Sequence, residues 1–163
     1  MINGIVRKRV PLVHCITNYV TVNDVANAIL ACGGSPIMSD DIDEVSQIAS
    51  ISNALVINIG TLNKRTIASM IQAGIAANNK NIPVVLDPVG AGASQLRNET
   101  VKTLLEQVKF AVIRGNLSEV SFIAGLNVST RGVDSAEQDS ANDAVEVAKN
   151  VARKCGCVVA ITG

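Results

Sequence analysis

The stretch Ile82-Pro-Val-Val-Leu-Asp-Pro-Val-Gly-Ala-Gly92 decides the fold of this chain. Its first half is short, apolar and rich in β-branched residues, without polar alternation, which is typical of a strand covered on both faces in a parallel sheet. Asp87-Pro88 then ends the strand, and Gly90 and Gly92 allow a close turn of the backbone. The stretch therefore predicts a buried strand that delivers a carboxylate and a glycine-rich loop to one edge of a sheet.

Five further apolar runs of this kind are spread along the chain. They are Leu12 to Ile16, Ser35 to Met38, Ala54 to Ile59, Phe110 to Ile113 and Cys157 to Ile161. Between the runs, apolar residues recur with the spacing of amphipathic helices, most clearly in the ranges 22–30, 67–75 and 141–152. Because strands and helices alternate, the sequence predicts an α/β fold with a mostly parallel sheet and right-handed crossovers.

The chain shows no internal repeat or low-complexity segment, and we expect a single domain over residues 1–163. Ser39 is expected to cap the start of a helix, because the acidic residues Asp41, Asp43 and Glu44 follow it and acidic residues favour helix N-termini. The polar stretch from Asn127 to Ser140 is expected to be a surface loop.

The composition excludes several classes of function. Lys and Arg number 14, as do Asp and Glu, and the chain has one tyrosine, two phenylalanines and no tryptophan. Without a basic stripe or an aromatic platform, nucleic-acid binding is not expected. No apolar stretch approaches the ~20 residues of a membrane span, and the N-terminal residues lack a signal-peptide pattern, so we expect a cytoplasmic protein with no membrane partner.

The cysteines and the single histidine do not indicate a metal centre. Cys15, Cys32, Cys155 and Cys157 lack the spacing of a zinc site, and we expect them to be small buried residues in a reducing compartment. His14 lies in the middle of a predicted strand, where a hydrogen-bonded core histidine is expected rather than a catalytic one.

Polar and glycine residues gather where the predicted strands end. The segments that follow the six strands are Thr17-Asn18, Ser39-Asp40, Gly60-Thr61, Asp87 to Gly92, Arg114 to Asn116, and Thr162-Gly163. The carboxyl ends of parallel strands share one edge of an open sheet, and ligands bind at that edge. This pattern predicts a small-molecule site.

Asp87 to Gly92 has two interpretations. In the first, the glycines let the backbone approach a phosphate, and the free N–H groups of a following helix bind the phosphate oxygens. The alternative is a plain turn, since Asp-Pro after a strand commonly forms one. The segment lacks the full GxGxxG pattern, so it does not predict a dinucleotide site.

Asn116-Leu-Ser-Glu119 also has two interpretations, and they are compatible. If a helix begins here, Asn116 and Glu119 face the same side and could act on the hydration shell of Mg²⁺, which takes few protein ligands. The alternative is a capping box, with Asn116 as N-cap and Glu119 at the third helical position. Asp87 and Glu119 come from different strand ends on the same edge of the sheet, so together they could hold one metal ion.

Arg114 and Met38 are further candidates at strand ends. A guanidinium at this edge suits bidentate contact with phosphate oxygens, although an ion pair with a nearby acid is the alternative. Met38 suits the wall of a pocket for a small ring, although methionine is more often core filling.

Several stretches, taken together and in order, resemble the hydroxyethylthiazole kinases of thiamin salvage. They are His14-Cys-Ile-Thr-Asn18, Asn23-Asp-Val-Ala-Asn27, Ser35-Pro-Ile-Met-Ser39, Asn58-Ile-Gly-Thr61, Leu86-Asp-Pro-Val-Gly-Ala-Gly92, Ile113-Arg-Gly-Asn116 through Glu119, and the terminal Ile-Thr-Gly. The resemblance runs essentially from end to end. It implies transfer of the ATP γ-phosphate to the hydroxyl of 4-methyl-5-(2-hydroxyethyl)thiazole, a step in thiamin biosynthesis.

The resemblance also implies a fold and a set of site residues. The fold would be a ribokinase-like three-layer sandwich without a lid domain, assembled as a homotrimer whose pocket is shared between neighbours. Met38 and Asn18 would bind the thiazole, and Arg114 and Thr162 would contact ATP. Asp87 and Glu119 would organise Mg²⁺.

Family members continue past the point that matches Gly163, through a glycine-rich loop that supplies the anion hole and a catalytic cysteine. None of the four cysteines here occupies that position, so we assign no general base and expect it beyond Gly163, with the C-terminal part of the fold missing from this chain. The alternatives are a naturally short, non-catalytic relative that binds nucleotide or thiazole, and a phosphosugar- or nucleotide-binding module that uses Asp87 to Gly92 without catalysis.

Overall fold

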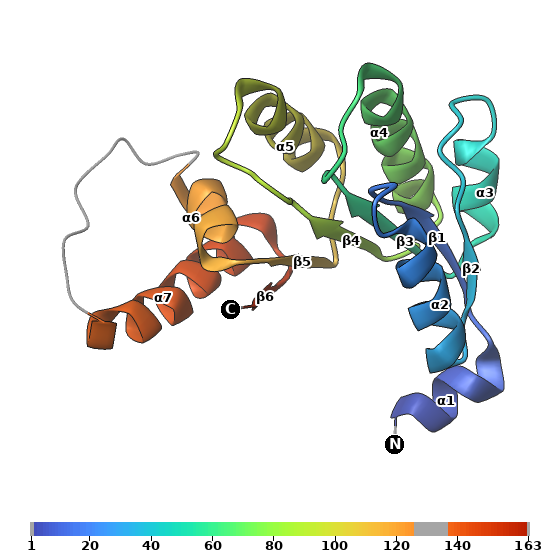
Figure 1. The fold of residues 1–163 in the computed structure, drawn as a ribbon, viewed down its shortest axis with the longest axis horizontal. Coiled ribbons are helices and arrows are strands. Elements are labelled where there is room, and N and C mark those ends of the chain that lie inside the picture. The colour runs from blue at the N-terminus through green and yellow to red at the C-terminus, as the bar shows by residue number, and fades with distance from the viewer. Residues whose placement is uncertain (1, 126–136, 163) are drawn as a thin grey trace.

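The computed structural model describes residues 2–125 and 137–162 (Figure 1). In chain order the elements are α1 (Ile2–Arg9), β1 (Leu12–Ile16), α2 (Val22–Cys32), β2 (Ser35–Ile37), α3 (Val45–Ile51), β3 (Ala54–Asn58), α4 (Lys64–Asn79), β4 (Val84–Asp87), α5 (Gln95–Gln107), β5 (Val112–Gly115), α6 (Leu117–Gly125), α7 (Glu137–Cys155) and β6 (Val158–Ile161). Each predicted strand overlaps one of these strands, with ends that differ by up to two residues, and each predicted helical stripe falls within one of the helices.

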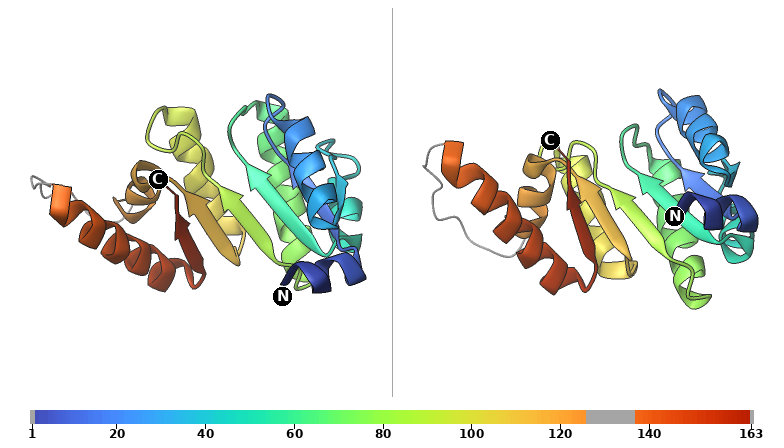
Figure 2. Two further views of the ribbon diagram at one scale, coloured as in Figure 1. Left: turned by 60° about the horizontal axis from the view of Figure 1, so that its bottom comes forward. Right: turned by 90° about the horizontal axis from the view of Figure 1, so that it is seen from below.

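The described strands form one six-stranded sheet in the order β2-β1-β3-β4-β5-β6, and every pairing is parallel. The α/β fold with a parallel sheet is therefore confirmed. From β1 to β2 the chain crosses toward one edge of the sheet, and from β2 through β5 it crosses toward the opposite edge. Right-handed crossovers therefore place α2 on one face and α3, α4 and α5 on the other, as Figures 1 and 2 show. All six carboxyl ends consequently lie along the same edge.

Burial along the strands shows that the two faces of the sheet are covered unequally. Leu55, Ile57 and Leu86, which share one face by the strand register, are fully buried. Val56 and Val85, which alternate with them, are only half-buried. At β3 and β4, the expectation of strands covered on both faces therefore holds for one face only. Among the described helices, α2 covers the other face, and it lies over β1 and β2 rather than over β3 and β4.

Two predictions outside the strands are also wrong. Helix α3 begins at Val45 rather than after Ser39, because the Ser39 hydroxyl does not accept a helix N–H and instead donates to Glu44 Oε1 at 2.5 Å. Helix α7 begins at Glu137, so the residues from Glu137 to Ser140 are helical and not part of a loop. The rest of the predicted loop, residues 127–136, lies outside the described residues.

The four cysteines are free thiols in different environments. Cys15 is buried, Cys155 and Cys157 are half-buried, and Cys32 is exposed. The expectation of burial is therefore wrong for Cys32, which ends α2, a helix with no buried residue. Among the described helices none is both long and apolar enough to cross a membrane.

Gly74 lets α4 and the segment after α5 approach closely. A Cβ at Gly74 would lie 2.5 Å from Cγ2 and 2.8 Å from Cγ1 of Val108. Val108 and Gly74 are both buried, so the position has no room for even a methyl group. This contact holds the C-terminal end of α5 close to α4.

Candidate functional site

A row of polar side chains crosses three strands at their carboxyl ends. Asn58 is the register partner of Asp87, and Leu86 is the partner of Ile113, which brings Arg114 level with Asp87. Asn58 Nδ2 donates to Asp87 Oδ2 at 2.9 Å, and an Arg114 amino group donates to the same oxygen at 3.1 Å. Parallel register thus gathers an amide, a carboxylate and a guanidinium from three distant parts of the sequence.

The Asp87 carboxyl lies where ionisation is costly, since its side chain is only 16% exposed. Burial is the main influence and raises its pKa, and the nearby Glu119 carboxylate acts in the same direction. The charge and hydrogen bond of Arg114 and the hydrogen bond of Asn58 oppose this, but the pKa remains above its ordinary value. A cation bound at this carboxylate would therefore be favoured, because it would offset the cost of the buried charge.

Glu119 ties two loops together. Its Oε1 accepts the backbone N–H of Gly90 and its Oε2 accepts that of Asn116, each at 2.9 Å. Asn116 Oδ1 in turn accepts the Glu119 N–H at 2.9 Å, which makes the reciprocal capping box at the start of α6. The capping interpretation of this motif is therefore confirmed.

The remaining lone pairs suit a divalent ion that keeps part of its water shell. Within the described residues only Oδ2 of Asp87 accepts hydrogen bonds, which leaves Oδ1 open to a ligand. Glu119 uses one lone pair of each oxygen for backbone N–H groups and could reach an ion through water. No group of three or more His, Cys, Asp or Glu side chains in the described residues could hold a metal, so an ion here would also need oxygens from a ligand.

Thr162 and Asn18 flank this row on its two sides. The Thr162 N–H donates to the Gly115 carbonyl at 2.9 Å, which places Thr162 beside the end of β5. Asn18 Nδ2 lies 3.4 Å from Asn58 Oδ1, and Asn18 Oδ1 accepts from both the N–H and the hydroxyl of Thr21. Asn18 thus orders the entry to α2 and extends the polar row toward β1.

Met38 stands apart from the row. It is half-buried directly after β2, the edge strand, and two strands separate β2 from β4. The ring of His14 is fully buried beneath this segment, and its Nε2 lies 2.7 Å from the Ser39 carbonyl, so Nε2 is the protonated nitrogen. Burial lowers the pKa of His14, so the ring is the hydrogen-bonded core histidine that the sequence indicates.

Two residues of the site were missed from the sequence. Asn58 could have been identified, because it is a polar residue that directly ends a β-branched run at a strand end. Arg97 on α5 could not, although its guanidinium donates to three backbone carbonyls of the strand-end loops. Nothing in its spacing distinguishes it from a solvated helix arginine.

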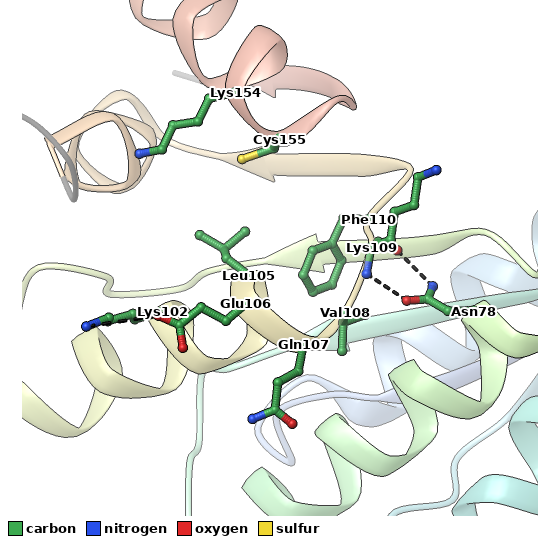
Figure 3. A pocket seen from close by; sticks show the side chains of 10 residues that line it. All are labelled: Asn78, Lys102, Leu105, Glu106, Gln107, Val108, Lys109, Phe110, Lys154 and Cys155. Carbon is green, nitrogen blue, oxygen red and sulfur yellow. Dashed lines mark hydrogen bonds and ion pairs between the residues drawn. The ribbon is translucent and has the colours of Figure 1, made fainter.

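Two hollows bear on where a ligand could bind. One of about 580 Å³ lies beside the strand-end loops and is lined by Gly90 to Ala93, Asn116 and Glu119 among others. Another of about 560 Å³ lies at the opposite edge, between the C-terminal ends of α5 and α7 (Figure 3). There the Asn78 amide pairs with both the N–H and the carbonyl of Lys109, so its polar group serves the fold. None of the predicted site residues lines the second hollow.

The open parallel sheet, the glycine-rich loop and the carboxylate–guanidinium row define an α/β protein with a candidate ligand site at the carboxyl edge of its sheet. Residues 4–163 match the model of the hydroxyethylthiazole kinase family, and the chain belongs to that family.

The chain is similar to individual members along nearly its whole length. It is 66% identical over 159 residues to a hydroxyethylthiazole kinase of Ruminiclostridium cellulolyticum, covering 97% of this chain and 58% of the relative. It is 62% identical over 161 residues to one of Clostridium beijerinckii, again covering 97% and 58%. The solved hydroxyethylthiazole kinase structure from Pyrococcus horikoshii superposes with a TM-score of 0.87 at 38% identity, covering 99% of this chain and 59% of that one. The chain thus spans somewhat more than half the length of these relatives.

Proposed function

We propose that this protein transfers the γ-phosphate of ATP to the hydroxyl of 4-methyl-5-(2-hydroxyethyl)thiazole, in thiamin biosynthesis, in the cytoplasm. The observation that carries the proposal is the family match over residues 4–163 combined with the polar row of Asn58, Asp87 and Arg114 at the ligand edge. Phosphoryl transfer depends mainly on positioning and on charge stabilisation, which is what a row of fixed charges supplies.

Arg114 and Thr162 would contact the phosphates of ATP. The Arg114 side chain is 51% exposed and gives one amino group to Asp87, so further N–H donors of its planar guanidinium can reach phosphate oxygens. Asp87 and Glu119 would hold Mg²⁺, partly through water, and the ion would offset the phosphate charge when bound. Asp87 would in addition keep Arg114 oriented.

Met38 and Asn18 would bind the thiazole in a pocket shared between neighbouring subunits of a homotrimer. Two observations support this arrangement. Met38 lies far across the sheet from Asp87 within one chain. Apolar surface also stays exposed around α2, where Tyr19 is 75%, Val20 74% and Leu30 56% exposed. Pairing of such surface with another copy of the chain would bury it.

We assign no general base to the described residues, and we treat residues 1–163 as a single ribokinase-like domain. The second candidate function is a non-catalytic relative that binds nucleotide or thiazole. It is favoured by the one observation that both oxygens of Glu119 already serve the fold.

A chimera tests the proposal. Residues 1–163 are joined to the part of the Ruminiclostridium cellulolyticum kinase that this chain does not match, and formation of thiazole phosphate is measured by mass spectrometry. We expect product that requires Mg²⁺ and ATP, and at least ~100-fold less with Arg114→Met. The matched control Arg153→Met, an exposed residue of α7, should be unaffected. A folded chimera without activity would contradict the function, and an active Arg114→Met would contradict the role of Arg114.

A further inference from the structure

Arg97 reaches from α5 across the base of two strand-end loops. One amino nitrogen of its guanidinium donates to the carbonyls of Ile59 at 2.6 Å and Val89 at 2.5 Å. The other donates to the Gly60 carbonyl at 2.7 Å. Ile59 and Gly60 follow β3, and Val89 follows β4, so one side chain bridges the ends of two adjacent strands.

The same two loops carry the polar row, which makes the bridge relevant to the site. Asn58 lies next to Ile59, and its Oδ1 accepts the Gly60 N–H at 2.8 Å. Asp87 lies two residues before Val89. The loop after β4 is therefore held from one side by Arg97, through Val89, and from the other by Glu119, through the Gly90 N–H.

Gly90 packs directly against the Arg97 side chain. Its φ of 71° lies in the left-handed region, and a Cβ there would meet the Arg97 side chain at 3.2 Å. The glycine allows the loop to close over the guanidinium, which needs both the positive φ and the missing side chain.

Arg97 has no acidic partner among residues 2–125 and 137–162. The ion pairs of the described residues are Arg65–Asp40, Lys102–Glu106, Arg114–Asp87 and Lys149–Glu146. Within the described part of the chain, the partners of the Arg97 guanidinium are carbonyl dipoles, and they lie at the edge where an anionic ligand is expected. The planar guanidinium spreads its N–H donors over two amino nitrogens and so reaches three carbonyls on two loops, whereas the three donors of a lysine sit on one nitrogen.

We propose that Arg97 is a positioning residue for the nucleotide: it locks the loops after β3 and β4 together, so that Asn58 and Asp87 are held in register before Mg·ATP binds. The inference rests on the proposed function for the identity of the ligand. The locking itself concerns the chain alone.

Hydrogen exchange and Mg·ATP binding together test the proposal, with Arg97→Met, Arg97→Lys and the control Lys102→Met on the exposed side of the same helix. In Arg97→Met we expect the amides of Gly60 and Gly90 to exchange at least ~10-fold faster, with unchanged protection of the buried strands, because a charge-assisted hydrogen bond is worth about a factor of ten or more. By calorimetry, Mg·ATP affinity should fall at least ~10-fold in Arg97→Met and by less in Arg97→Lys, which keeps the charge. Lys102→Met should match the wild type in both measurements.

Several results would overturn the proposal. One is that both Arg97 variants keep the amide exchange rates and the Mg·ATP affinity of the wild type. Another is that amide exchange becomes faster while Mg·ATP affinity does not change. Protection lost evenly over the whole sheet would mark Arg97 as part of the fold only. If Arg97→Met does not fold, Arg97→Lys alone decides, and wild-type affinity in that variant counts against the proposal. If the wild type itself does not bind Mg·ATP, the proposed function fails, while the exchange rates still decide whether Arg97 locks the loops.

Discussion

Replacing Glu119 by glutamine should destabilise the protein even when no metal is present. Each oxygen of the carboxylate accepts one backbone N–H, from Gly90 and from Asn116, and the side chain is almost fully buried, with the residue 8% exposed. Glutamine offers one oxygen and one NH₂ group in nearly the same shape. Whichever way the amide is turned, its NH₂ faces an N–H, and one part-buried backbone donor loses its acceptor.

The size of the effect follows from these two bonds. An unsatisfied buried donor costs about 1–3 kcal/mol, and the surviving bond loses the strengthening that a charged acceptor gives. We therefore expect Glu119→Gln to lower the free energy of unfolding by about 2–3 kcal/mol. For a chain of this size that corresponds to a fall in Tm of roughly 4–12 °C.

The assay is urea unfolding followed by circular dichroism, in EDTA and again with Mg²⁺. The matched control is Glu106→Gln on α5, whose side chain is 60% exposed and 4.0 Å from Lys102. That change should alter the free energy of unfolding by less than ~0.5 kcal/mol. A Glu119→Gln protein as stable as the control in EDTA would refute the argument, because it would mean that Glu119 acts through a metal and not through the two loops.

Three further predictions follow from packing and charge. Gly74→Ala should lower the free energy of unfolding by about 1–3 kcal/mol, because overpacking against Val108 outweighs the gain in helix propensity. Denaturation of the single and double variants should show that Val108→Ala reduces this loss. A loss that is the same with and without Val108→Ala would contradict the clash. Asp87→Asn should be more stable than the wild type at neutral pH, because a carboxyl whose pKa is raised in the folded state lowers stability once it ionises. The difference in Tm between variant and wild type should vanish below about pH 3.9, the pKa of the carboxyl in the unfolded chain. A Tm difference that grows on acidification would contradict this reasoning. Iodoacetamide at neutral pH should label the exposed Cys32 well before Cys157, because burial raises the pKa of the Cys157 thiol to about 11. Peptide mass spectrometry that shows the reverse order of labelling would contradict this prediction.

The sequence was informative where a local signal coincides with the end of a strand. Asp87 and Arg114 each end a visible apolar run, and parallel strands bring such ends to one edge whatever their order, so their placement could be predicted. Their pairing with each other could not be predicted, because it depends on β4 lying beside β5 in a particular register. Glu119 was recognised through its spacing from Asn116, which is a property of the helix itself.

The failures share a physical cause. Arg97 acts through a long side chain whose partners are backbone carbonyls, and carbonyls leave no trace in the residue types. The start of α3 was misplaced because Ser39 has both a donor and an acceptor, and only the fold decides that the hydroxyl donates to Glu44. The exposure of Cys32 depends on what covers α2, which the pattern of α2 does not contain.

The most direct test of the central claim is ³¹P NMR of ATP titrated with this chain, with and without Mg²⁺, beside the 66% identical kinase of Ruminiclostridium cellulolyticum as reference. The account predicts Mg²⁺-dependent shifts of the β- and γ-phosphate resonances with the wild-type chain, lost in Arg114→Met and in Asp87→Asn. Resonances that move equally with the wild type and both variants, or with the reference kinase alone, would contradict the claim that the strand-end row binds Mg·ATP.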